Sequence, residues 1–83
     1  MNKILYKFGA SWCNPCKMLS ETMKSVDLGE IQFVEVDIDQ RHDMAKEFGI
    51  RSVPTLVLLD VDTGEQKRVS ANLTAQGVRE FIS

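Results

Sequence analysis

The sequence predicts an α/β fold with the element order βαβαββα, in which helices cover both faces of a four-stranded mixed sheet. Three observations lead to this prediction. Runs rich in β-branched and aromatic residues alternate with segments of helical periodicity. Two strand–helix units in series predict right-handed crossovers and a pair of parallel strands. A Thr-Gly-Glu turn at residues 63–65 joins the last two strands and makes them antiparallel.

The four expected strands cover residues 3–8, 31–38, 54–61 and 66–71. The first ends at Gly9, and the Thr-Gly-Glu turn separates the last two. The run PTLVLLDV at residues 54–61 is the most continuous apolar segment of the chain, so it should be the central strand. The strand at residues 66–71 should lie beside it at the edge of the sheet.

The three expected helices cover residues 14–28, 40–48 and 74–82. Apolar residues at three- and four-residue steps mark the first helix, namely Met18, Leu19, Thr22, Met23 and Val26. Pro15 is tolerated in its first turn, and Gly29 follows its end. Asp39 and Thr74 are the expected N-caps of the second and third helices, and Gly49 follows the second helix.

The chain has 83 residues, the size of one small domain, and we assign residues 1–83 to a single domain. The net charge is −2 with acids and bases interspersed, unlike the clustered lysines and arginines of nucleic-acid-binding proteins. No run approaches the ~20 apolar residues of a membrane span, and the N-terminus lacks a signal h-region. We expect a soluble cytoplasmic monomer that binds neither nucleic acid nor membrane.

Both cysteines lie in the segment SWCNPCK, residues 11–17, where the first strand leads into the first helix. The amides and partial positive charge of a helix N-terminus stabilise a thiolate, so the pKa of Cys13 should fall from ~8.5 to ~7 or lower. Sulfurs at positions i and i+3 of a first turn can reach disulfide distance. Cys13 can then attack a substrate disulfide, and Cys16 can resolve the mixed disulfide. Packing cysteines or half of a metal site are the alternatives.

The segment WCNPCK resembles the active-site signature of the thioredoxin family, usually Trp-Cys-Gly-Pro-Cys-Lys. The resemblance extends to LYKFGASWCNPCKM, VEVDIDQ and FGIRSVPTLVLL and so covers most of the chain. It implies a minimal thioredoxin-like fold and a small thiol–disulfide oxidoreductase that reduces protein disulfides. The resemblance implies no cofactor beyond a redox-active disulfide. In that comparison Cys13 takes the place of the nucleophile and Cys16 that of the more buried, resolving cysteine.

The resemblance also implies a substrate-binding loop. Val53 and Pro54 take the place of the family's cis-proline loop, which opposes the disulfide and offers backbone hydrogen bonds to an incoming peptide. An ordinary trans proline that opens a strand is the alternative. Ser70 and Ala71 fall near a small Gly-Ala stretch that the family places beside its dithiol, and Ala71 is a candidate substrate contact.

Residues next to the cysteines are further substrate-binding candidates. Trp12 should form a half-exposed apolar wall beside the pair, and filling the core is the alternative for this side chain. Asn14 replaces the usual glycine between the cysteines. Together with Pro15 it should tune the geometry of the turn.

Two charged residues depart from the family pattern. The family buries an aspartate six residues before the nucleophile and a lysine on the adjacent strand, whereas this chain has Lys7 and Glu35 at those places. We hypothesise that Glu35, directly or through a water, accepts the proton of Cys16 during resolution, while Lys7 favours the thiolate. Two solvated side chains on neighbouring strands are the alternative.

The resemblance implies protein-disulfide substrates, with ribonucleotide reductase as one candidate, and thioredoxin reductase or glutathione as electron donor. A glutaredoxin-like, glutathione-dependent redoxin is an alternative, because the chain lacks the additional N-terminal strand and helix of full-size thioredoxins. A non-catalytic module that binds a metal or cluster, or serves as a subunit of a complex, is a third interpretation. Zinc usually needs four ligands, and the chain offers two thiols and one distant histidine, His42. We predict no metal site and expect His42 on the surface.

Overall fold

The computed structural model describes residues 2–70 and 72–83. Its elements are β1 (Lys3–Gly9), α1 (Asn14–Met23), β2 (Gln32–Asp37), α2 (His42–Glu47), β3 (Thr55–Asp60), β4 (Gln66–Val69) and α3 (Ala75–Ile82). The predicted βαβαββα order is therefore confirmed. Ala71, a predicted substrate contact, lies outside the described residues.

The sheet has the strand order β2-β1-β3-β4, with β1 and β3 at its centre. The strand expected to be central is thus central, and β4 is the expected edge strand. β1 and β2 are parallel, whereas β3 is antiparallel to both β1 and β4. Only the first helical connection therefore joins parallel strands. The expectation of a second such crossover is wrong, because α2 leads the chain to the opposite side of β1, where β3 pairs in the reverse direction.

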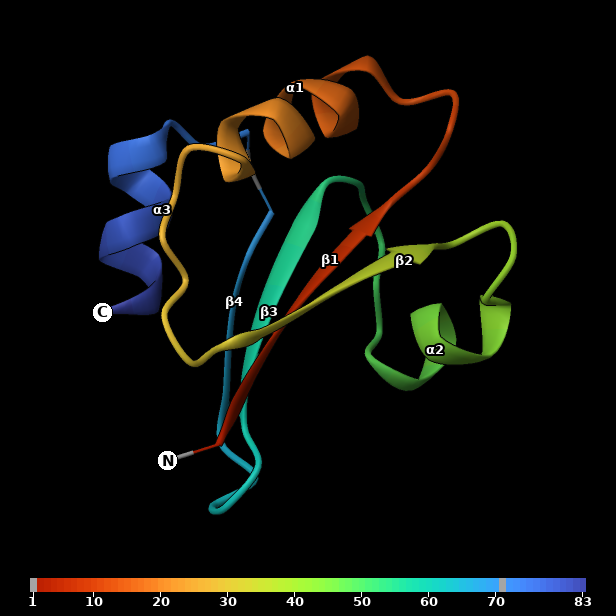
Figure 1. The fold of residues 1–83 in the computed structure, drawn as a ribbon. Helices are drawn as coiled ribbons and strands as arrows, with labels where there is room; N and C mark the ends of the chain where they lie inside the picture. The colour runs from red at the N-terminus through yellow and green to blue at the C-terminus, as the bar shows by residue number, and fades with distance from the viewer. Residues whose placement is uncertain (1, 71) are drawn as a thin grey trace.

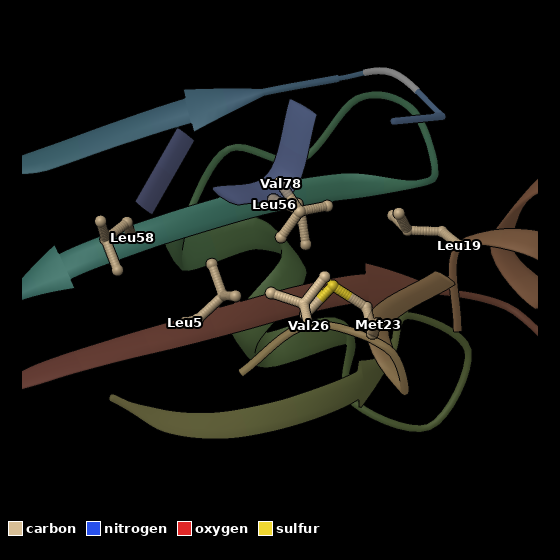
Figure 2. Packing of buried hydrophobic residues seen from close by; sticks show 7 residues of the cluster. All are labelled: Leu5, Leu19, Met23, Val26, Leu56, Leu58 and Val78. Carbon is tan, nitrogen blue, oxygen red and sulfur yellow. The ribbon is translucent and has the colours of Figure 1, made fainter. Parts of the chain in front are cut away.

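The helices cover both faces of the sheet, as predicted. Helices α1 and α3 lie over one face and α2 over the other (Figure 1). Side chains of a strand alternate between faces, so Leu5 of β1 faces α1 and α3, while Phe8 packs in the cluster beneath α2. Figure 2 shows the buried side chains of the larger cluster, which are Leu5, Leu19, Met23, Val26, Leu56, Leu58 and Val78.

Helix α1 ends at Met23 rather than at residue 28. Beyond it, the amides of Ser25 and Val26 bond to carbonyls three residues earlier, which is a tighter turn than an α-helix. The Ser25 hydroxyl also donates to the Thr22 carbonyl at 2.8 Å, a local bond that competes with regular helix. The turn still brings Val26 into the core.

One member of the predicted apolar stripe of α1 is misplaced. Met18 is 61% exposed, whereas its neighbour Leu19 is fully buried. Successive residues of an α-helix lie about 100° apart around the axis, so the two side chains cannot share one narrow face. The buried stripe consists of Leu19 and Met23, and it continues to Val26 beyond the helix end.

Helix α2 begins at His42, later than predicted, and Asp39 is not its cap. The N-cap position is held by Arg41, which makes no side-chain capping bond. The end is as predicted: Gly49 has φ +64°, and its amide bonds to the Lys46 carbonyl. The Ile50 amide bonds to a carbonyl one residue further back, which completes a glycine C-cap.

The predicted cap of α3 is confirmed, because the Thr74 hydroxyl oxygen accepts a hydrogen bond from the Gly77 amide at 3.1 Å. The strand before α3 ends at Val69 rather than at residue 71, and Ser70 makes a side-chain contact with Thr55 instead of extending the ladder. None of the helices within residues 2–70 and 72–83 has the length and apolar character needed to cross a membrane.

The adjacent residues Leu19 and Met18 provide a test of the packing in α1. Leu19→Ala should lower the free energy of unfolding of the oxidised protein by about 2–5 kcal/mol, because it leaves a cavity in the larger core cluster. Met18→Ala should change it by less than about 0.5 kcal/mol, because that side chain faces solvent. Urea denaturation measures both. Equal losses in the two variants would contradict this packing.

Candidate functional site

The two cysteines lie where β1 passes into α1, at the carboxyl end of the first central strand (Figure 1). After Gly9 the chain makes a tight turn in which the Cys13 amide donates to the Ala10 carbonyl at 3.1 Å. Helix α1 then begins at Asn14, and Pro15 occupies its first turn as predicted. The turn places the start of the helix at the carboxyl end of β1, which is the end of the sheet where open α/β folds have their sites.

The sulfur of Cys13 caps helix α1. Cys13 is the N-cap residue, and its Sγ accepts a hydrogen bond from the Cys16 amide at 3.2 Å, in the place usually taken by a serine or aspartate oxygen. Cys13 and Cys16 are joined by a disulfide. Their exposed fractions are 4% and 2%, so burial barely distinguishes them. The two cysteines differ in position, because Cys13 lies at the positive end of the helix and Cys16 lies one turn inside it.

The loop before β3 packs against the cysteines. The Val53–Pro54 peptide bond is cis, and Val53 contacts the small cluster of Ala10, Cys13 and Cys16. The sequence placed these segments together only through the family resemblance, since about forty positions separate them.

The buried hydroxyl of Thr55 connects that loop to the segment after β4. It donates to the Ser52 carbonyl at 2.7 Å and lies 2.9 Å from the hydroxyl oxygen of Ser70. Sequence reasoning did not single out Thr55. A threonine directly after a proline at the start of an apolar strand was the available signal.

Trp12 stands beside the disulfide with 65% of its surface exposed, so it does not fill the core. Its indole Nε1 donates to Asp39 Oδ2 at 2.9 Å, and the Asp39 amide in turn donates to Asp37 Oδ1 at 2.8 Å. Asp39, expected to cap α2, therefore orients the tryptophan. Nothing in the sequence pointed to this pair, which lies 27 positions apart. Asn14, like Pro15, is exposed.

Lys7 and Glu35 are register partners on β1 and β2, and their Nζ and Oε2 atoms are 3.6 Å apart. The side chain of Lys7 is 4% exposed, whereas that of Glu35 is 57% exposed. The alternative of two solvated side chains thus describes Glu35 but not Lys7. Lys7 is a buried cation on the strand that ends beneath the cysteines.

A cavity of about 560 Å³ opens at this end of the sheet. Lys7, Gly9 and Cys16 line it together with Glu35 and Arg41. Gly9 matters because a Cβ at that position would lie 3.4 Å from both Cys16 Sγ and Lys7 Nζ. The absence of a side chain there leaves the space between the cation and the sulfur open.

The guanidinium of Arg41 is held by Asp43 through two hydrogen bonds of 3.1 Å. These bonds lower the pKa of the Asp43 carboxyl below its usual value. His42, between them in sequence, is exposed as expected. Across residues 2–70 and 72–83, no three His, Cys, Asp or Glu side chains gather in a way that could hold a metal ion.

Comparison with known proteins gives a consistent result. The sequence model of the thioredoxin family matches residues 1–83. A thioredoxin of Mycoplasmoides gallisepticum is 36% identical over 69 residues, covering 81% of this chain and 69% of the relative. One from Rickettsia felis is 36% identical over 73 residues, covering 84% of this chain and 68% of the relative.

Solved structures agree with the sequence relatives. A mutant thioredoxin from Halobacterium salinarum superposes with a TM-score of 0.84 at 30% identity, covering 96% of this chain and 71% of that one. A thioredoxin of Fasciola hepatica gives a TM-score of 0.86 at 27% identity, covering 98% of this chain and 78% of that one. The fold is thus shared, and membership of the family implies protein-disulfide substrates and a reductase partner. The chain belongs to the thioredoxin family and is a thiol–disulfide oxidoreductase with protein-disulfide reductase activity, whose redox centre is the pair Cys13–Cys16.

Proposed function

We propose that the protein reduces disulfides of other proteins with Cys13 as the nucleophile and Cys16 as the resolving cysteine. The observation that carries this assignment is the cap of α1, where Cys13 Sγ accepts the Cys16 amide. In the reduced protein the same amide and the helix dipole stabilise negative charge on Cys13, which lowers the pKa of its thiol. Cys16, one turn further along, lacks this stabilisation and is held for the second step.

The reaction proceeds through two exchanges. The Cys13 thiolate attacks one sulfur of the substrate disulfide, and the other substrate sulfur leaves as a thiolate that takes up a proton. Cys16, as a thiolate, then attacks Cys13 Sγ, forming the Cys13–Cys16 bond and releasing the second substrate sulfur. The substrate gains two electrons and the cysteine pair loses two.

We place the substrate peptide along the loop at Val53 and Pro54. Val53 packs against the disulfide, so a strand bound to the backbone of this loop would present its sulfur to Cys13. Trp12 supplies an exposed apolar surface on the site, and Asn14 and Pro15 lie exposed between the cysteines. Ala71 remains a substrate contact proposed from the sequence alone.

We propose a thioredoxin reductase as the electron donor, in keeping with the family to which the chain belongs. Glutathione is the alternative donor. Ribonucleotide reductase is one candidate among the protein substrates, and a cytoplasmic location stays a prediction.

Serine variants of the two cysteines should separate their roles. Both Cys13→Ser and Cys16→Ser should reduce insulin at less than about 1% of the parent rate, because each removes one exchange step. Only Cys16→Ser should accumulate a covalent mixed disulfide with a protein substrate, since its nucleophile is intact. Non-reducing gel electrophoresis and mass spectrometry detect that adduct. Accumulation in Cys13→Ser instead would reverse the assignment.

Removing the hydrogen bond to Trp12 should weaken substrate binding. Asp39→Ala should raise KM for a protein disulfide about three- to tenfold, as expected for the loss of one hydrogen bond that orients the indole. The rate with a small disulfide should stay unchanged, because the cysteines are untouched. Asp62→Ala, in the β3–β4 turn, serves as the control. An equal KM effect in both variants would argue against an orienting role for Asp39.

The two recycling routes can be compared directly. With insulin as substrate, NADPH and thioredoxin reductase should regenerate the dithiol faster than glutathione and glutathione reductase at matched reductant concentrations. The rate of NADPH oxidation is the measurement. Faster turnover with glutathione would assign the protein to the glutaredoxin-like alternative while leaving the cysteine chemistry in place.

A further inference from the structure

Lys7 is a buried charge for which the two exchange steps above provide no use. Lysine is rarely buried without a strong partner, yet the carboxylate paired with it belongs to a half-exposed Glu35 and lies 3.6 Å away. An ion pair of this kind contributes little to stability, because desolvation of the buried lysine offsets the attraction. Lys7 is therefore better explained by what its ammonium group faces.

The ammonium of Lys7 faces the same small space as the sulfur of Cys16. A Cβ built on Gly9 would lie 3.4 Å from Lys7 Nζ, 3.4 Å from Cys16 Sγ and 3.3 Å from Cys16 Cβ. Because both atoms lie 3.4 Å from one point, they are separated by at most twice that distance. Every other residue type would place a side chain in this gap. At Gly9 the space stays open.

We propose that Lys7 holds a fixed positive charge against Cys16 across the gap left by Gly9, and thereby stabilises the Cys16 thiolate that resolves the mixed disulfide. The proposal deepens the proposed function and rests on it. Lys7 is a positioning residue, because it acts on the Cys16 sulfur through its electrostatic field. The side chain of Lys7 is 4% exposed, so solvent screens that field far less than it screens a surface charge.

The proton balance of the resolving step follows. The Cys16 thiol releases its proton to solvent through the open cavity, and the thiolate attacks Cys13 Sγ. The bond between Cys13 and the substrate breaks, and the substrate sulfur leaves as a thiolate that is then protonated. Lys7 transfers no proton in this step, and its ammonium group faces the Glu35 carboxylate before the step and the Cys16 thiolate during it.

Other charged groups near Cys16 are less well placed for this task. The cavity is lined by ionisable side chains from β1, α1, β2 and the segment before α2, namely Lys7, Cys16, Lys17, Glu35, Asp37 and Arg41. Lys17 is exposed, and Arg41 is exposed and bound to Asp43. Glu35 and Asp37 are acidic and would disfavour a second negative charge. Lys7 is the cation among them that is buried.

The first test measures the Cys16 thiol alone, in a Cys13→Ser background that removes coupling between the two thiols. Lys7→Met should raise the pKa of Cys16 by about one to two units, the shift expected from loss of an opposite charge within a few ångströms. Lys17→Met is the matched control, and should shift the pKa by less than about 0.3 units because its ammonium is in solvent. Thiolate absorbance against pH gives the values.

The second test follows resolution of a preformed mixed disulfide on Cys13 in the two-cysteine protein. Lys7→Met should slow release of the substrate thiol about tenfold or more at pH 7. The rate should recover to near the parent value above the raised pKa, because only the thiolate fraction is changed. Structural damage would slow the reaction equally at all pH values. The proposal would be overturned if Lys7→Met changed neither the release rate nor the pKa of Cys16. It would also be overturned if the release rate fell and did not recover at high pH.

Two further variants separate Lys7 from its neighbours. Gly9→Ala should reproduce part of the Lys7→Met effect and should add nothing to it in the double variant, because both act on one interaction. Glu35→Gln should leave resolution unchanged or faster, since it removes the competing counter-ion. If Glu35→Gln slows resolution while Lys7→Met does not, Glu35 is the proton acceptor and the proposal for Lys7 is wrong.

Failure here is distinguishable from failure of the proposed function. If Cys16→Ser does not trap a mixed disulfide, the assignment of Cys16 itself falls. If it does, and Lys7→Met still resolves at the parent rate, only the role of Lys7 falls. Gly9→Ala, which keeps the buried lysine and its ion pair, provides the measurement should Lys7→Met fail to fold.

Discussion

The rest of the site depends on the cap of helix α1. The first amides of a helix have no intrahelical partner, and a side-chain acceptor at the N-cap position satisfies one of them. Here that acceptor is a sulfur, and the bond from the Cys16 amide to Cys13 Sγ serves the helix and the chemistry together. The same short turn sets the reach between the two sulfurs, so helix geometry provides the spacing that disulfide exchange requires.

Three segments meet at this helix start, and two of them are distant from it in sequence. The end of β1 and the residue after it contribute Gly9 and Ala10, the loop before β3 contributes Val53, and the segment after β2 contributes Asp39. They meet because β1 is a central strand, with β2 on one side and β3 on the other. The parallel β1–β2 pair brings two carboxyl ends to one edge, and the antiparallel β3 starts at that same edge. Strand order and direction are thus what assemble the site.

Burial of Lys7 runs against what a thin core favours. Hydrophobic burial leaves an 83-residue domain only a small margin of stability. Leu5 of β1 belongs to the larger core cluster, and Lys7, two residues along the same strand, is on the same face. A leucine in place of Lys7 would extend that cluster towards the cysteines. Sites that depart from the local packing rule in this way are commonly functional. The open space at Gly9 and the buried cation form one such departure.

Features that depend on neighbouring residues were predictable from the sequence. The Thr74 cap, the glycine end of α2, Pro15 in the first turn of α1 and the cysteine spacing all involve contacts within a few positions. The strands followed from their composition, because β-branched and aromatic runs suit a pleated sheet wherever it forms. The family resemblance extended these predictions to the loop at Val53 and Pro54.

Tertiary structure decided the rest, because it depends on which residues meet across the fold. Asp39 looked like a helix cap locally, yet packing brings it to Trp12, 27 positions away. Met18 fitted the apolar stripe, yet α1 turns it to solvent. The direction of β3 depends on its place beside β1, and periodicity does not encode that. Sequence alone did not tell Lys7 and Glu35 apart in burial, whereas in the structure Lys7 lies on the central strand β1 and is buried, and Glu35 lies on the edge strand β2 and is half-exposed.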